Sequence, residues 1–257
     1  MSRRIKLIIQ YDGSAYNGWQ IQPSGVTIQG LLQESLFRVT GEKVSITAAG
    51  RTDAGVHAIE QVAMFDSVSV LGADVIKKAA NAVLPPDIRV VDAGDAEGRF
   101  HPRYDATGKR YTYVIANMRD IPPFIHKYVW CFKIPLDLGA MKSASACLLG
   151  KHDFSSFRGS GCGSRSPVKE IHAIEVEKAD SMPFLFTQFR GNFIILSIEA
   201  DAFLRHMARN IVGTVTEVGR GRMSPDRIKE ILKSKDRKLA GPAAPPCGLF
   251  LEKVFYD

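Results

Sequence analysis

The chain has 257 residues, of which 45% are hydrophobic and 24% are charged. This length suits one large domain or two smaller ones, and this composition excludes wholesale disorder and a fibrous protein. No apolar run approaches the roughly 18 residues that a transmembrane helix needs, and Lys6 and Asp12 interrupt any signal-peptide core. We therefore expect a soluble, cytoplasmic protein without a membrane partner.

The formal net charge of +7 is unevenly distributed along the chain. Residues 1–104 carry 11 basic and 11 acidic side chains, whereas residues 105–257 carry 23 and 16. A basic surface attracts the phosphates of nucleic acid, although a solvated surface has the same composition. The four cysteines show no Cys-x-x-Cys spacing, so we expect reduced thiols and no metal site.

The first half of the chain predicts the element order β-α-β-β-α-β. Thr27 is the expected N-cap of the first helix, and Pro85-Pro86 ends the second. This order is typical of ferredoxin-like, RNA-recognition-like folds of the α+β class. The predicted elements are a strand at 5–11, a helix at 28–39, strands at 44–48 and 58–65, a helix at 74–83 and a strand at 88–92.

The second half repeats this rhythm less clearly. Its predicted elements are a strand at 111–115, a helix at 141–149, strands at 168–176 and 193–198, a helix at 203–218, a basic helix capped by Ser224 and opened by Pro225, and a strand at 249–255. We expect two related ferredoxin-like α/β domains, 1–104 and 105–257, whose antiparallel or mixed sheets meet at a central cleft. The Gly159–Pro167 stretch, which contains Cys162, predicts a flexible cationic loop of unassigned role.

Three segments carry side chains suited to chemistry. The first is residues 50–57, Gly-Arg-Thr-Asp-Ala-Gly-Val-His, which place Asp53 on a tight turn between two glycines. Its carboxylate either projects into a cleft or hydrogen bonds its own turn. Arg51 either pairs with Asp53 or points to the opposite side.

The second segment is Lys109-Arg110-Tyr111-Thr112-Tyr113, in which basic and aromatic residues are interleaved on a strand. Aromatic rings can stack on an unpaired base while the cations meet phosphates, but ordinary cross-strand aromatic pairs give the same pattern. The third segment is the helix containing Arg205 and Arg209. Arg209 lies at the edge of its apolar stripe, where it either holds a carboxylate ionised across a cleft or is a surface arginine.

These segments resemble the tRNA pseudouridine synthase A family, and the resemblance covers almost the whole chain in order. The most specific motif is Ala49–His57, centred on Asp53. The other matching motifs are Tyr11-Asp12-Gly13, Tyr16-x-Gly18-Trp19-Gln20-x-Gln22, Thr27-Ile28-Gln29, Lys109-Arg110-Tyr111-x-Tyr113, His152-Asp153-Phe154, Phe203-Leu204-x-x-Met207-x-Arg209-x-Ile211 and Ala244-Pro245-x-x-Gly248-Leu249.

The resemblance implies an isomerase that converts uridine to pseudouridine at positions 38, 39 and 40 of the tRNA anticodon arm, without metal or organic cofactor. It implies that Asp53 is the nucleophile, acting either at the sugar C1′ or by assisting elimination to a glycal, before the uracil turns and rejoins through C5. Arg209 keeps Asp53 ionised, and Tyr111 stacks on the flipped-out uracil and helps to remove the C5 proton. Arg51 occupies the space that the base leaves, and Leu249 lines the pocket.

The resemblance also implies that Lys109, Arg110 and Arg205 bind the substrate and that the enzyme is a homodimer. Two other classes of protein remain open at this stage. An RNA-binding module without catalysis would explain the charge and the aromatics, but it gives no reason for an acid at position 53. A glycoside-hydrolysing enzyme would need a second carboxylate, and none lies close to Asp53 in the sequence.

Overall fold

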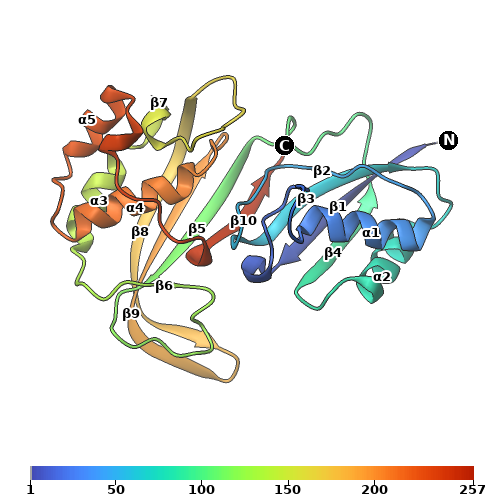
Figure 1. Ribbon diagram of the computed structural model, residues 1–257, viewed down its shortest axis with the longest axis horizontal. Coiled ribbons are helices and arrows are strands. Elements are labelled where there is room, and N and C mark those ends of the chain that lie inside the picture. The colour runs from blue at the N-terminus through green and yellow to red at the C-terminus, as the bar shows by residue number, and fades with distance from the viewer. Residues whose placement is uncertain (1) are drawn as a thin grey trace. The chain divides into compact units, whose positions relative to one another are not determined.

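The computed structural model of the protein describes residues 2–257, which divide into two compact units. The second unit is Gly108–Leu249, and the first is the chain up to Thr107 together with Phe250–Asp257. The fold is mixed α/β, with helices α1 to α5 and strands β1 to β10 (Figure 1). In the strand predicted at 249–255, the residues from Phe250 onward therefore belong to the first unit.

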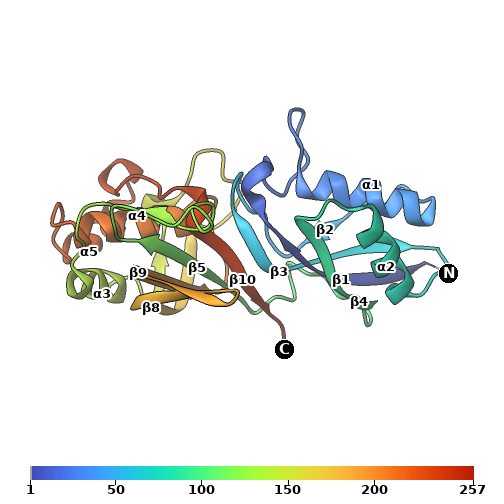
Figure 2. The same cartoon turned by 90° about the horizontal axis from the view of Figure 1, so that it is seen from below.

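The first unit has a sheet in the order β4-β1-β3, with antiparallel neighbours. Strand β2 pairs antiparallel with β3, and β10 pairs parallel with the start of β3. Helices α1 and α2 pack against each other beside this sheet (Figure 2). The elements are β1 (Arg3–Tyr11), the 3₁₀ turn Gly13–Ala15, α1 (Ile28–Thr40), β2 (Thr47–Ala48), β3 (His57–Ser67), α2 (Ala73–Val83), β4 (Ile88–Asp95) and β10 (Leu249–Phe255).

Local sequence explains where these elements begin and end. The Thr27 side chain accepts a hydrogen bond from the N–H of Gly30, which confirms it as the N-cap of α1. Gly41 ends α1 in the left-handed conformation at φ 74°. Leu84, which follows α2, is extended because Pro85 disfavours a helical residue before it. In β1, Ile5, Leu7 and Ile9 alternate with more exposed residues and form part of the buried core.

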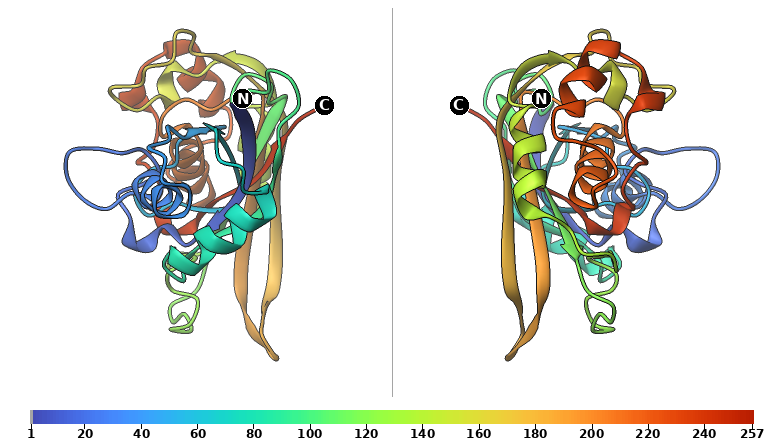
Figure 3. Two further views of the ribbon diagram at one scale, coloured as in Figure 1. Left: turned by 90° about the vertical axis from the view of Figure 1, so that its right-hand side faces the viewer. Right: turned by 90° about the vertical axis from the view of Figure 1, so that its left-hand side faces the viewer.

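The second unit has a sheet in the order β5-β9-β8-β7, in which all neighbours are antiparallel. Strands β8 and β9 form a long hairpin (Figure 3), and β6 pairs parallel with β5. Helix α3 packs against α4 and β8. The elements are β5 (Gly108–Ala116), β6 (Trp130–Cys131), α3 (Leu138–Ala146), β7 (Gly150–Asp153), β8 (Val168–Phe184), β9 (Thr187–Ala200), α4 (Met207–Gly219), α5 (Arg227–Ser234) and 3₁₀ turns at Ser155–Phe157, Arg237–Leu239 and Pro246–Gly248.

Helix α4 begins four residues later than the predicted helix at 203–218. His206, directly before it, has a left-handed backbone at φ 61°, which a helix cannot continue through. The carbonyl of Arg205 accepts a hydrogen bond from the N–H of Gly159 at 2.8 Å, so this turn is bonded to the loop and not to a helix. The apolar residues Phe203 and Leu204 extended the helical periodicity without belonging to the helix.

Several other predicted boundaries were wrong. The strand at 44–48 is reduced to Thr47–Ala48. The helix at 141–149 lies at Leu138–Ala146, because the Asp137 side chain caps it by accepting from the N–H of Ala140. The basic helix has Asp226 as its N-cap instead of Ser224, whose carbonyl accepts from the N–H of Arg227 in a preceding turn. The short strands β6 and β7 were not predicted.

None of the helices within residues 2–257 is long and apolar enough to cross a membrane.

Helix α4 makes a close approach that gives a test of the packing of the second unit. A Cβ added at Gly213 would lie 1.8 Å from the carbonyl oxygen of Pro242. We therefore expect Gly213→Ala to lower the free energy of unfolding by about 1–3 kcal/mol, since overpacking forces a backbone shift. Denaturant unfolding measures this change. Gly163→Ala is the control, because no atom lies within 4 Å of its added Cβ; an equal loss in both variants would contradict the packing argument.

Candidate active site

Asp53 lies in an irregular turn between β2 and β3 in the first unit. The side chains around it alternate, with Arg51 exposed, Thr52 buried and Asp53 half-buried. The Asp53 carbonyl accepts a hydrogen bond from the N–H of Val56 at 3.1 Å, which closes the turn. The burial pattern places Arg51 on the exposed side of this turn, one of the two orientations that the sequence left open.

Three hydrogen bonds from other elements hold this turn. The Tyr11 hydroxyl lies 2.8 Å from the Thr52 hydroxyl, and Gln61 donates to the Gly50 carbonyl at 2.8 Å. The N–H of Trp19 donates to the Thr52 carbonyl at 3.1 Å. Burial raises the pKa of Tyr11 to about 12, with the hydrogen bonds to Thr52 and Gln61 acting in the opposite direction. The residues on both sides of the turn are thus bonded to β1, β3 and the loop before α1.

Gly18 brings the loop before α1 into direct contact with this turn. Its φ of 83° is a conformation that favours glycine, and an added Cβ would lie 2.6 Å from the Thr52 carbonyl oxygen and 3.0 Å from the Asp53 carbonyl carbon. The N–H of Gly55 also donates to the Tyr16 carbonyl, at 3.3 Å. Neither Gly18 nor Tyr11 was among the predicted site residues, although both lie in the motifs that carry the resemblance.

Tyr111 lies on β5 in the second unit, opposite Ile198 of β9. It is 7% exposed, and its ring contacts Phe203 edge to face at a centroid distance of 4.8 Å. Lys109 and Arg110, the two basic residues before Tyr111, have different surroundings. Lys109 is also 7% exposed, and the Arg110 guanidinium forms an ion pair with Glu199 at 2.8 Å.

Arg209 lies in the first turns of α4 and is half-buried. Its Nε donates to the Ala244 carbonyl at 2.8 Å, and the N–H of Ala244 donates back to the Arg209 carbonyl at 3.0 Å. The next residue, Pro245, accepts a hydrogen bond from the Tyr113 hydroxyl at 2.8 Å. Burial raises the pKa of Tyr113, and the Arg209 charge acts in the opposite direction.

Leu249 is buried at the end of the same segment. The residue before it, Gly248, packs directly on Tyr113, since an added Cβ would lie 2.8 Å from the ring. Within the second unit the structure therefore brings together Arg209, Tyr113 and the segment that leads to Leu249. Arg205 is exposed and lies against the loop Gly159–Pro167, called the glycine-rich loop below. Its guanidinium donates to the Ser160 carbonyl at 3.1 Å.

The predicted residues are divided between the two units. Asp53 and Arg51 belong to the first unit, and Lys109, Arg110, Tyr111, Arg205, Arg209 and Leu249 belong to the second. Within residues 2–257, no group of three or more His, Cys, Asp or Glu side chains is arranged to hold a metal ion.

Comparison with known proteins shows the family of the chain. A family model described as tRNA pseudouridine synthase matches residues 7–105 and 144–257. The chain belongs to this family. The synthase is 46% identical to "tRNA pseudouridine synthase A" of Myxococcus xanthus over 98% of this chain and 92% of the relative. It is 43% identical to the protein of the same name of Thermoanaerobacter sp. (strain X514), over 99% of this chain and 100% of the relative.

A solved structure, that of the archaeal box H/ACA sRNP Nop10-Cbf5 complex, matches the synthase with a TM-score of 0.32 and 11% identity. That match covers 83% of this chain and 44% of the other.

Gly18 gives a test of how the Asp53 turn is held in the synthase. If Asp53 is the reacting carboxylate, we expect Gly18→Ala to lower kcat for pseudouridine formation by at least about tenfold, because the added Cβ displaces the backbone of residues 52–53. Gly41→Ala is the matched control, since Gly41 has a similar φ of 74° but no atom within 4 Å of an added Cβ. Single-turnover kinetics with unmodified tRNA separate the two variants. A kcat for Gly18→Ala equal to that for Gly41→Ala would show that the contact does not position Asp53.

The pKa of Tyr11 gives a test at alkaline pH. Its pKa rises from an ordinary value of 10.0 to about 12 on folding, so the unfolded chain loses this proton first. The contribution of Tyr11 to the free energy of unfolding is therefore complete below pH 10. It is lost as the pH rises to 12, and the loss amounts to about 3 kcal/mol. We expect Tyr11→Phe to make the unfolding free energy fall less steeply between pH 10 and 12 than it does in the wild type. Parallel curves for the wild type and Tyr11→Phe would argue against this linkage.

Proposed function

We propose that Asp53 is the nucleophile with which this isomerase converts uridine to pseudouridine at positions 38, 39 and 40 of the tRNA anticodon arm. The observation that supports this proposal most is the fixed, half-buried turn that presents Asp53 beside the exposed Arg51. Preorganisation of this kind positions a reacting group without a further entropic cost. The family membership and the near full-length relatives support the same reaction.

A carboxylate suits the first chemical step. The carbon–nitrogen bond between ribose and uracil breaks, and the anion of Asp53 either bonds to C1′ or assists elimination to a glycal. The uracil then turns, and a bond forms between its C5 and C1′ as the Asp53–C1′ bond breaks or as the glycal regains its C2′ proton. C5 then loses a proton and N1 gains one, so the product is an isomer of the substrate. Arg209 is the proposed cation that keeps the carboxylate ionised, because an opposite charge favours the charged form of an acid.

The base needs a partner once it leaves the RNA stack. Tyr111 is the proposed stacking residue and helps to remove the C5 proton after the new bond forms. The Tyr111 ring contacts Phe203 edge to face, and the Tyr111 side chain is only 7% exposed. Both features restrict the orientation of the ring. Arg51 is the proposed residue that fills the space left by the base, and Leu249 is proposed to line the uracil pocket.

Lys109, Arg110 and Arg205 are proposed to bind the tRNA backbone. Arg205 is exposed, which favours this role, whereas a phosphate at Arg110 would compete with Glu199. We further propose that the enzyme is a cytoplasmic homodimer that needs no metal or organic cofactor.

We propose domains 1–104 and 105–257 with related ferredoxin-like architecture, the residues from Phe250 onward being added to the sheet of the first unit. The order β4-β1-β3 with β2 on β3 supports this for the first unit, since ferredoxin-like sheets have the strand order 4-1-3-2.

The proposal is tested by Asp53→Asn. This change removes the nucleophile but keeps the size of the side chain, so we expect pseudouridine formation to be abolished while tRNA affinity falls by less than about tenfold. Asp74→Asn, which removes an exposed carboxylate from α2, is the control and retains full activity. Unmodified tRNA is incubated with each purified variant without added metal, and pseudouridine is quantified. Turnover by Asp53→Asn would show that another residue initiates the reaction.

A further inference from the structure

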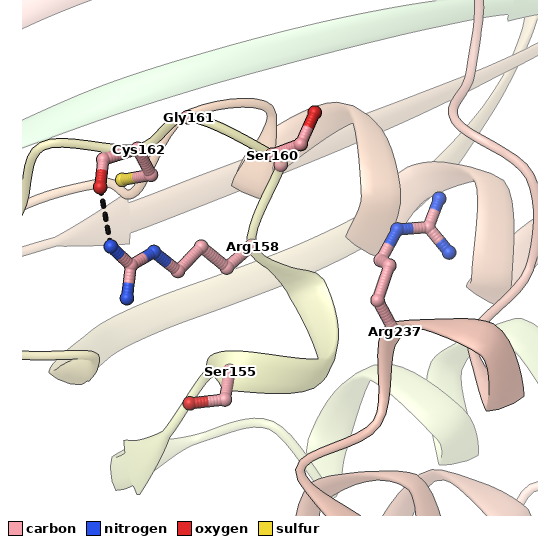
Figure 4. Close-up of a pocket in the computed structure, with 7 residues that line it drawn as sticks. Ser155, Arg158, Ser160, Gly161, Cys162 and Arg237 are labelled. Carbon is pink, nitrogen blue, oxygen red and sulfur yellow. Dashed lines mark hydrogen bonds between the residues drawn. The ribbon is translucent and has the colours of Figure 1, made fainter.

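A cationic pocket of about 550 Å³ lies in the second unit, and none of residues 244–249 lines it. Arg158 and Arg237 line it together with Ser160, Gly161 and Cys162 of the glycine-rich loop (Figure 4). The two arginines come from different parts of the chain, one directly after the 3₁₀ turn Ser155–Phe157 and one from the turn Arg237–Leu239. Of the residues given roles above, Arg205 donates to the Ser160 carbonyl of this loop but does not line the pocket itself.

The loop is bonded into a definite shape, although its composition predicted flexibility. The N–H of Gly159 donates to the Arg205 carbonyl at 2.8 Å, and the Arg205 guanidinium donates back to the Ser160 carbonyl at 3.1 Å. An added Cβ at Gly159 would lie 2.6 Å from His206 Nδ1, and Gly161 has a φ of 67°. Glycines are therefore required here for close contact and for backbone conformation.

The positive charge around the pocket is not neutralised within the protein. Arg237 donates to the Gly241 carbonyl at 2.9 Å and to the Asn210 side-chain oxygen at 2.9 Å. Arg158 donates to the Cys162 and Ser164 carbonyls. Throughout residues 2–257, neither of these arginines nor Arg205 forms an ion pair with a carboxylate. Burial lowers the pKa of Arg237, because the fold removes water from the charge without supplying an anion.

Cys162 reports the same electrostatic environment. Its Sγ accepts a hydrogen bond from the N–H of Arg205 at 3.4 Å. Burial acts to raise the pKa of this thiol, but hydrogen bonds from the backbone of Arg205 and Ser164 and from Arg158 outweigh it, so the pKa lies below its usual value. A site that stabilises a sulfur anion has donors and charge arranged for an anion in general.

We propose that this pocket binds a phosphate group of the tRNA backbone, outside the uridine that reacts. The inference rests on the proposed function, since it takes tRNA as the ligand. Guanidinium groups bind phosphate by paired N–H donors, and the two that line this pocket, Arg158 and Arg237, provide an anion site of matching charge without carboxylate partners. The pocket extends the RNA contact beyond the reacting nucleotide and contributes affinity without contributing to the chemical step.

The dependence of tRNA affinity on salt tests this proposal. Each phosphate contact releases counterions, so we expect Arg158→Gln to weaken tRNA binding and to reduce the slope of log K against log salt by about one. Arg237→Gln has the same expected effect. Arg227→Gln is the matched control, because Arg227 is already paired with Glu230 on α5, and it leaves both quantities unchanged. A wild-type slope in both Arg158→Gln and Arg237→Gln would overturn the proposal.

Loss of loop structure is distinguished from loss of charge by Arg158→Lys. This variant keeps the charge and loses the bonds to Cys162 and Ser164, so it retains most of the salt slope if the pocket acts through charge. A slope as low as that of Arg158→Gln, with a lower unfolding midpoint, would show a structural effect and overturn the proposal. Normal pseudouridine formation by the wild type in the same assays separates a failure of the pocket from a failure of the proposed function.

Alkylation of Cys162 distinguishes tRNA from free phosphate as the ligand. The rate with iodoacetamide is followed by peptide mass analysis, with Cys147 of the same unit as the internal reference. We expect unmodified tRNA at micromolar concentration to slow alkylation of Cys162 at least about fivefold and to leave Cys147 unaffected. Inorganic phosphate should protect only at far higher concentration. Protection by phosphate alone, or by neither ligand, would overturn the assignment to the tRNA backbone.

Discussion

The close approach of Gly18 to the backbone of residues 52–53 is the contact on which the position of Asp53 depends. The loop before α1 lies so close to the turn that there is no room for a side chain at Gly18. The buried pair of Tyr11 and Thr52 fixes the other side of the same turn. In the role proposed for Asp53, a carboxylate held in this way needs no rearrangement when the substrate arrives, and such preorganisation is a main source of catalytic power.

In the second unit, Arg209 is held by a different set of hydrogen bonds. Arg209 and Ala244 exchange two hydrogen bonds, one from a side chain and one from the backbone, and Tyr113 bonds the neighbouring Pro245. The segment that ends at Leu249 is thereby attached both to α4 and to β5. Buried polar groups that satisfy one another restrict a segment to one conformation, because each broken bond leaves a group without a partner.

Much of the fold could be predicted, because its elements have strong local signals. Thr27, Pro85 and the alternating apolar residues of β1 act through short-range effects that are visible in the sequence. The start of α4 could not be predicted, since His206 takes its left-handed conformation beside a loop that lies far away in the chain. The same limit applies to the site. The motif around Asp53 pointed to the turn, but the contact with Gly18 joins positions whose proximity only the folded structure provides.

The arginines show the limit of sequence reasoning about charge. The excess of basic residues in the second half was visible, but composition does not distinguish Arg110, which pairs with Glu199, from Arg158 and Arg237, which have only uncharged partners. These pairings decide which positive charges can attract an anion. They depend on the register of β5 against β9 and on the path of the loop after Phe157, both of which are long-range properties.

The chain passes from the first unit to the second and back again, and this has a consequence for biosynthesis. Residues from Phe250 onward return to the first unit, where β10 lies beside the start of β3 at His57 and Ala58. A ribosome must therefore finish the whole of Gly108–Leu249 before the strand next to the Asp53 turn can be added. Since domains otherwise tend to fold as they emerge, the first unit stays incomplete until the residues from Phe250 onward have been synthesised.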